Sequence, residues 1–250
     1  MESNTTLNTL EKKEFFLYNV ASGIKAGVPI AVGYIPIAIA FGLLAKSLGI
    51  PNIISVLMSI IVFAGASQFV GVKLIALGAA PLEIIMTTFI LNFRHFLMSS
   101  SLSQRIESGT SKKLLNILTF GITDETFSVA SLQEEAKLNP YFLLGLNFSA
   151  YLSWVLGTCI GVFLAGGLPD AIKSSMGIAL YAMFIGLLVP AFKGSKNIFL
   201  VSMAAVFINS LLYWSPLFKF LSTGWSIIIS TMLAAGMGSY FFPQGGKKDE

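Results

Sequence analysis

The sequence predicts an all-α membrane protein, a polytopic bundle of seven or eight transmembrane helices. Only 11% of the residues are charged and 55% are hydrophobic, whereas a soluble domain has about 25% charged residues. The mean hydropathy is +0.79. Apolar stretches recur along almost the whole chain, each near the ~20 residues that cross about 30 Å of hydrocarbon. They leave no room for a soluble domain, so we expect a single transmembrane domain over residues 1–250.

The apolar stretches place the spans in order, with boundaries uncertain by a few residues. The fourth is the weakest, because it contains Asp124 and Glu125, and without it the count is seven. A polar segment, 1–19, precedes the first span and does not have the pattern of a cleaved signal peptide. A polar tail, 243–250, follows the last. The predicted spans are 20–46, 53–77, 82–102, 114–132, 141–168, 175–192, 198–214 and 225–242.

Basic residues are scattered at the ends of the spans, often in pairs such as Lys112 and Lys113. This distribution is typical of short loops in membrane proteins and argues against nucleic-acid binding. Two orientations are open. Eight regular spans with the N-terminus inside put the basic loop 105–113 outside. If the second span is a re-entrant pair of half-helices, that loop lies inside.

A possible internal repeat relates residues 43–70 to residues 161–188 at a constant offset in the numbering. Repeated halves are a common transporter architecture, with the substrate bound where the repeats meet. The alternative is chance similarity between two apolar helices. The matched pairs are Gly49/Gly167, Pro51/Pro169, Met58/Met176 and Ala64/Ala182.

Few charged residues lie deep in the predicted spans. Arg94, one of two arginines, is near the middle of the third span beside His95, the only histidine, and the acids near a span centre are Asp124 and Glu125. A charge at the bilayer centre costs about 2.5–3.5 kcal/mol on insertion scales. We therefore expect Arg94 to pair with Asp124 or Glu125.

That pair has two interpretations. It is purely structural, or Arg94 holds a substrate carboxylate while an acid or His95 carries a coupling proton. Arginine suits a carboxylate because its planar fork forms two parallel hydrogen bonds. Histidine titrates near neutral pH.

The centre of the second span, 63–69, is rich in small residues followed by Ser67 and Gln68. These residues form either a helix-packing face or a break, where backbone N–H groups would face an anionic group. Gly33 and Pro36 suggest a similar break in the first span. Two interrupted helices at one depth favour a binding site.

Amides in the fifth and seventh spans, Asn147 and Asn209, either link helices or contact a substrate. The candidate set joins them to the residues above. For proton coupling or an ion pair it contains His95, Asp124 and Glu125. For substrate binding it contains Pro36, Gly65, Ala66, Ser67, Gln68, Asn92, Arg94, Asn147 and Asn209.

The sequence gives no sign of an enzyme or a cofactor. One histidine and one cysteine, Cys159, supply neither a nucleophile–base pair nor a metal site, and no nucleotide-binding motif is present. Any transport must then be driven by a gradient, by exchange or by a partner.

Three motifs resemble the AzlC family, the large subunits of bacterial branched-chain amino-acid exporters. They are residues 63–69, Asn92 to His95 with Met98 and Ser99, and residues 124–127; residues 23–27 and 33–36 fit as well. Phe93 stands where the family pattern suggests an aliphatic residue.

The resemblance implies a multi-pass transporter of the bacterial cytoplasmic membrane. It exports branched-chain or related hydrophobic amino acids in a proton-coupled exchange, and it works with a small hydrophobic partner subunit of the AzlD type. The residues are compatible with this, because Arg94 would hold the carboxylate of a zwitterion and Asp124 or Glu125 its ammonium group. The alternative function is a passive channel for a small solute.

Overall fold

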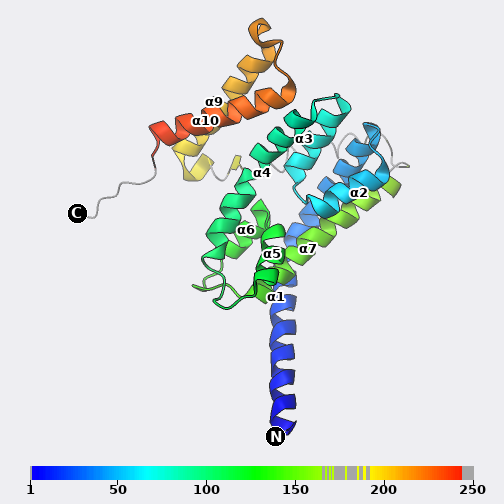
Figure 1. The fold of residues 1–250 in the computed structure, drawn as a ribbon, viewed down its shortest axis with the longest axis vertical. Helices are drawn as coiled ribbons and strands as arrows, with labels where there is room; N and C mark the ends of the chain where they lie inside the picture. The colour runs from blue at the N-terminus through cyan, green and yellow to red at the C-terminus, as the bar shows by residue number, and fades with distance from the viewer. Residues whose placement is uncertain are drawn as a thin grey trace, which may run out of the picture. The chain divides into compact units, whose positions relative to one another are not determined.

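The computed structural model describes residues 2–164 and 192–243, with isolated positions between 167 and 189. Side chains are described from residue 13 onward. Within these ranges the chain is helical and contains no strand (Figure 1). An isolated bridge joins Ile106 and Leu138. The all-α class is therefore confirmed for the described part of the chain.

The helices follow the predicted spans closely in several places. One helix covers each of the third, seventh and eighth spans, and two consecutive helices cover most of the fifth. The sixth span, 175–192, and most of the second copy of the repeat lie outside the described residues. In order, the elements are α1 (Glu2–Ser47), α2 (Asn52–Ile61), α3 (Gly65–Ala76), α4 (Pro81–Ser103), α5 (Lys112–Phe120), α6 (Asp124–Ser131), α7 (Pro140–Cys159), the π-helix η1 (Ile160–Leu164), α9 (Lys196–Trp214), the short 3₁₀ helix η3 (Pro216–Phe218) and α10 (Thr223–Phe241).

Three helical stretches of the described residues are long and apolar enough to cross a membrane: Lys13–Ser47, Pro140–Leu164 and Lys196–Trp214. Large apolar side chains are exposed on many helices, and Trp214 and Tyr240 are 77% and 80% exposed. Exposed apolar surface of this extent is typical of a protein that faces lipid. The count of seven or eight spans stays a prediction.

The chain divides into two compact units. Unit 1 comprises Met1–Phe69 and Asn92–Gly177, and unit 2 comprises Val70–Leu91 and Ile178–Glu250. Helices α3 and α4 contribute residues to both. A single transporter domain over 1–250 stays a prediction.

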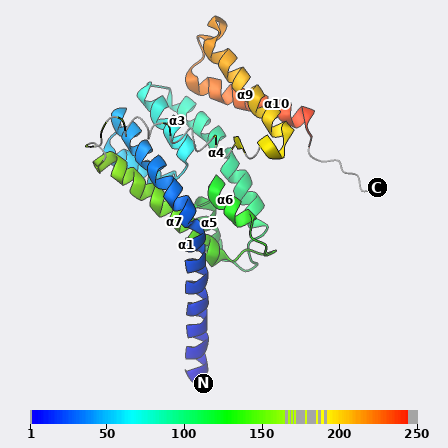
Figure 2. The ribbon, with the colours of Figure 1, turned by 180° about the vertical axis from the view of Figure 1, so that it is seen from behind.

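Unit 1 is built on α1 and α7, which lie side by side (Figures 1 and 2). Glycines on both helices allow their backbones to approach closely. A Cβ atom on Gly23 would overlap the carbonyl oxygen of Phe142, and one on Gly145 would overlap that of Val20. Small residues of this kind let membrane helices pack by van der Waals contact.

The break that the sequence suggested in the first span is absent. Helix α1 continues through Pro29 and Pro36 without interruption, and Pro36 is exposed. A proline removes one backbone hydrogen bond of a helix, and membrane helices tolerate this when neighbouring elements support them. Here the long contact with α7 supplies that support, so the prediction of a broken first helix is wrong.

The second span is interrupted as predicted. Helix α2 ends at Ile61 and α3 begins at Gly65. Between them Phe63 has a positive φ of 43°, which is uncommon for a residue other than glycine. The chain therefore changes direction within a segment that hydropathy alone treats as one span.

The fourth span is also interrupted, which the sequence analysis did not predict. Helix α5 ends at Phe120, and α6 begins at Asp124 after the N-cap residue Thr123. The side chains of Thr123 and Thr126 form a reciprocal capping box, which satisfies backbone N–H groups at the start of a helix. Asp124 and Glu125 thus lie in the first turn of a short helix and not at the middle of a continuous span.

Unit 2 contains α9 and α10, which pack against each other (Figure 1). A Cβ atom on Gly238 of α10 would lie 2.8 Å from a methyl carbon of Val201 on α9. The glycine therefore permits this contact. The two helices that it brings together are those that the sequence predicted as the last two spans.

Candidate functional site

The expected ion pair of Arg94 is present in unit 1. Its Nη1 atom lies 2.7 Å from Oδ2 of Asp124, and the two side chains are 35% and 28% exposed. The pair joins the middle of α4 to the first turn of α6. Asp124 also lies where the positive end of the α6 dipole favours an anion.

His95 follows Arg94 and contacts the same break from α4. Its Nδ1 atom lies 2.9 Å from the carbonyl oxygen of Ile122. A carbonyl oxygen can only accept, so Nδ1 carries the proton, and in the neutral ring Nε2 is an acceptor. Nε2 is buried without a hydrogen-bond partner among the described residues.

Two further polar atoms on this turn of α4 are buried and have no partner in the described part of the chain. They are Oδ1 of Asn92 and Nε of Arg94. Buried polar atoms without partners are rare in folded proteins, and each calls for an explanation. The stretch from Asn92 to His95 therefore offers one donor and two acceptors for a further group.

Tyr34 of α1 also contacts the break. Its hydroxyl group donates to Oε2 of Glu125 and lies 2.8 Å from Oγ1 of Thr123. Its ring packs edge-on against Trp154 of α7, with ring centroids 5.3 Å apart. Tyr34 thus ties α1, α6 and α7 together.

The α5–α6 break is also held from α7. The amide nitrogen of Asn147 donates to the carbonyl oxygen of Leu118 at 2.9 Å, and Gly121 is packed so closely that a Cβ atom would lie 2.6 Å from the Cβ of Asn147. Beside this contact is a mainly apolar cavity of about 300 Å³. Its lining residues are Ile117, Phe120, Gly121, Leu144, Asn147, Phe148 and Tyr151.

The α2–α3 break is satisfied internally by Gln68, which is fully buried. Its Oε1 atom accepts from the backbone of Ala64 at 3.2 Å and from Nε1 of Trp154 at 3.0 Å. Its Nε2 atom donates to Ser59 at 2.9 Å. Ser67 in turn donates to the carbonyl oxygen of Ala64 at 3.0 Å. Because Gln68 occupies the N–H group of Ala64, this donor is not available to an anion.

The remaining candidates are dispersed. Gly65 and Ala66 are half-buried, and Gly65 packs against the ring of Trp154. Pro36 is exposed on α1. Asn209 lies on α9 in unit 2. The structure therefore gathers Arg94, His95, Asp124, Glu125 and Asn147 around the α5–α6 break, with Asn92 one turn before His95 on α4, and it does not bring Pro36 to them.

Sequence reasoning missed Tyr34, Thr123 and Thr126 as parts of this site. The available signal was the spacing of the two threonines, which is that of a capping box. The role of Tyr34 follows from the close packing of α1 and α7, which no local pattern predicts. No cluster of three potential metal ligands occurs among the described residues.

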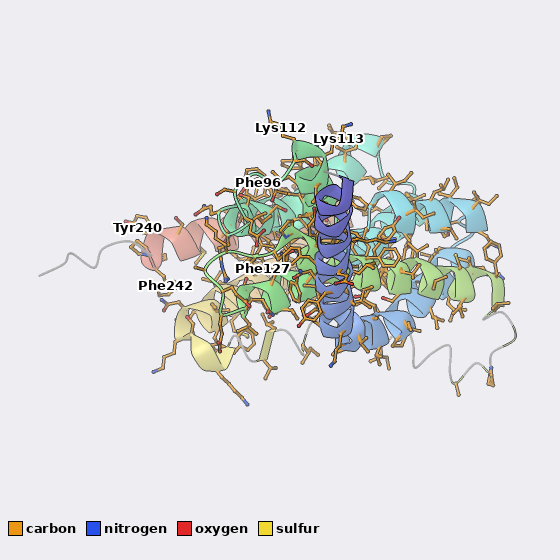
Figure 3. The ribbon with its side chains drawn as sticks, turned by 90° about the horizontal axis from the view of Figure 1, so that it is seen from below. Phe96, Lys112, Lys113, Phe127, Tyr240 and Phe242 are labelled. Atoms are coloured by element: carbon orange, nitrogen blue, oxygen red, sulfur yellow. The ribbon has the colours of Figure 1, made fainter. Side chains whose placement is uncertain are left out.

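The far end of α6 is held by the second arginine. The guanidinium of Arg105 donates to the carbonyl oxygens of Ser131, Gln133 and Glu135 at 2.7–2.9 Å. Each arginine thus secures one end of the short helix. The basic pair Lys112 and Lys113, at the start of α5, is instead exposed and extends away from the ribbon (Figure 3).

Interrupted helices within apolar spans, and polar groups buried beside one break, define a helical membrane protein of the transporter class. The family model described as AzlC protein matches residues 29–168, more than half of the chain. The chain belongs to the AzlC family.

Relatives agree with this assignment. The inner membrane protein YgaZ of Escherichia coli is 35% identical over 182 residues, which are 70% of this chain and 74% of that protein. A membrane protein of Archaeoglobus fulgidus is 36% identical over 75% of this chain and 81% of its own length. The branched-chain amino acid transport protein AzlC of Bacillus subtilis is 29% identical over 64% of this chain and 63% of that protein. No solved structure matches the chain.

Proposed function

We propose that this protein is a secondary transporter that exports branched-chain or related hydrophobic amino acids across the bacterial cytoplasmic membrane. The support is the set of unpaired polar atoms on α4, together with the relative from Bacillus subtilis that is named for branched-chain amino acid transport. The proposal places the charged end of the substrate beside the α5–α6 break.

An α-amino acid at neutral pH carries a carboxylate, which accepts hydrogen bonds, and an ammonium group, which donates them. The unpaired Nε–H of Arg94 is a donor, on a different nitrogen from the one that binds Asp124. The unpaired Oδ1 of Asn92 and Nε2 of His95 are acceptors. One donor and two acceptors are the complement that a zwitterion requires.

An apolar side chain needs a surface without unpaired polar groups. The cavity beside Gly121 is lined mainly by aliphatic and aromatic residues, and its volume of about 300 Å³ is at the lower end of the range for small-molecule sites. We place the side chain of a hydrophobic amino acid there, next to Asn147 and Tyr151.

For the coupling ion we propose protons, with His95, Asp124 and Glu125 as groups that take them up. Protonation of Asp124 would release Arg94, and protonation of Glu125 would change its hydrogen bond with Tyr34. Either event alters what holds α6 in place. A small hydrophobic partner of the AzlD type, as the family resemblance implies, belongs to the same proposal.

The test is a counterflow assay in vesicles that contain the chain, with and without the candidate partner subunit. We expect labelled leucine, isoleucine and valine to exchange, and lysine and glutamate not to. Arg94→Lys should reduce exchange roughly a hundredfold or more, because a misplaced contact at a binding site has an effect of that size. Lys112→Arg exchanges one basic residue for another at an exposed side chain outside the site, and it should leave exchange within about a few-fold of the parent in protein that inserts normally.

A parent chain that exchanges none of these amino acids would disprove the proposal. Exchange that survives Arg94→Lys would refute the site. Collapse of the proton gradient separates the proposal from its alternative. The net flux through a passive channel would stay unchanged, whereas a proton-coupled exporter would no longer accumulate substrate against its gradient.

A further inference from the structure

Glu83 is a buried acid in unit 2, on the same helix, α4, that carries Asn92 and Arg94 in unit 1. It lies in the first turn of α4 and is 6% exposed. From its place near the end of a span we expect such a side chain to reach the lipid headgroups. Instead, its Oε1 atom accepts from the hydroxyl of Ser222 at 2.5 Å and from the backbone N–H of Gly224 at 2.9 Å.

The carboxylate of Glu83 is held by one hydroxyl and one backbone N–H group. The charged groups on the surrounding elements are Lys73 on α3, Lys193 before α9, Lys196 on α9 and Lys219 after η3, and all four are exposed. The other titratable side chains of the described part of the unit, Tyr213 and Tyr240, are exposed as well.

Thr87 lies one turn further along α4 and is also fully buried. Its Oγ1 atom has no hydrogen-bond partner among the described residues. A Cβ atom on Gly224 would lie 2.5 Å from Oε1 of Glu83 and 2.8 Å from Oγ1 of Thr87. The carboxylate of Glu83 and the unpaired hydroxyl of Thr87 therefore both lie next to Gly224, at the N-terminus of α10.

We propose that Glu83, with Thr87, Ser222 and the N-terminus of α10, forms a proton-binding site of this transporter. In the ionised state the carboxylate accepts from Ser222 and Gly224, at the distances given above. When a proton from water binds, the new O–H group donates to Oγ1 of Thr87, while the other oxygen still accepts from Gly224. The hydroxyl oxygen of Thr87, which has no partner among the described residues, thus gains a donor.

The two states are stabilised by different features of the site. The N–H of Gly224 and the hydroxyl of Ser222 hold the carboxylate, and the hydroxyl oxygen of Thr87 is the acceptor for the protonated group. Ionisable groups buried in membrane domains are commonly parts of proton pathways. As a coupling site this inference rests on the proposed function, but proton binding itself can be measured without any substrate.

The experiment is infrared difference spectroscopy of the full chain in lipid vesicles, recorded between alkaline and acidic pH. We expect the C=O band of a protonated carboxyl group, shifted when H₂O is replaced by D₂O. Glu83→Gln should remove one component of that band, the component of Glu83, because the amide still accepts from Gly224 but binds no proton. Glu107→Gln changes an exposed acid and should leave it. Thr87→Val should weaken the band at a given pH and move it to higher frequency, since the acceptor is lost.

A transport measurement completes the test. In vesicles, proton movement driven by substrate should fall roughly tenfold or more in Glu83→Gln. The inference is overturned if Glu83→Gln removes no component of the carboxyl band, if Thr87→Val leaves the component of Glu83 unchanged, or if substrate-driven proton movement is unaffected. Failure of the proposed function would appear differently, as a parent chain that exchanges no amino acid while its carboxyl band is present. If Glu83→Gln does not fold, the Thr87→Val spectrum decides.

Discussion

The hydroxyl group of Tyr34 on α1 donates a hydrogen bond to Glu125 in the first turn of α6, although the two residues are ninety-one positions apart in the chain. The same side chain packs against Trp154 on α7, which in turn donates to Gln68 beside the other break. A single path of contacts thus runs from the α5–α6 break through Tyr34 and Trp154 to the α2–α3 break. The two interrupted segments of unit 1 are mechanically connected.

Tyr34→Phe should keep the ring contact with Trp154 and remove the hydrogen bonds to Glu125 and Thr123. A hydrogen bond to a charged group contributes about 1.5–3 kcal/mol, so we expect a loss of stability of that order and slower exchange. Thermal unfolding in detergent and counterflow measure the two effects. Tyr18→Phe, at a side chain 74% exposed, is the control; equal effects in both variants would contradict the role of Tyr34.

Arg94→Ala leaves Asp124 without its partner, whereas Arg94→Ala combined with Asp124→Ala removes both charges. Because both side chains are about one-third exposed, we expect the single variant to lose about 1–2 kcal/mol, between the values for surface and buried pairs. The double variant should be more stable than the single one. Exchange should be lost in both, and a stable, active double variant would show that the pair is purely structural.

Gln68→Leu should be among the most damaging substitutions in unit 1. It leaves the N–H of Ala64, the indole N–H of Trp154 and the hydroxyl of Ser59 without the bonds that Gln68 makes. Each buried unsatisfied group costs about 1–3 kcal/mol, so we expect about 3 kcal/mol or more. The yield of monodisperse protein and its thermal unfolding measure this, with the exposed Gln104→Leu as the matched control. A normal Gln68→Leu protein would contradict the assigned network.

Gly23→Ala and Gly33→Ala place the same methyl group on the same helix in opposite surroundings. At Gly23 it would overlap the backbone of α7, and at Gly33 nothing lies within 4 Å. We expect Gly23→Ala to lose about 1–3 kcal/mol through overpacking and Gly33→Ala to gain up to about 1 kcal/mol of helix propensity. Unfolding temperatures compare them, and a tolerated Gly23→Ala would show that α1 and α7 are further apart in solution.

The interruptions show where sequence reasoning succeeded and where it failed. The break in the second span was foreseen from its small and polar residues, and the structure has it at Phe63. The break expected at Pro36 is missing, because a proline costs one hydrogen bond that helix packing can offset. An unexpected break occurs at Thr123. A capped half-helix, by contrast, is stabilised by the threonines and by contacts from three other helices.

The sequence by itself determined that the protein is helical, that it belongs in a membrane, and that Arg94 needs an acid. These follow from composition and from the cost of a charge in hydrocarbon, which depend little on how the helices are arranged. Only the tertiary structure decided which acid pairs with Arg94, that Tyr34 binds Glu125, and that Glu83 is buried beside Thr87. Those outcomes depend on which helices pack together. In this protein α1 and α7 pack where glycines let their backbones approach. Such packing depends on both helix surfaces, so the sequence of one segment does not predict it.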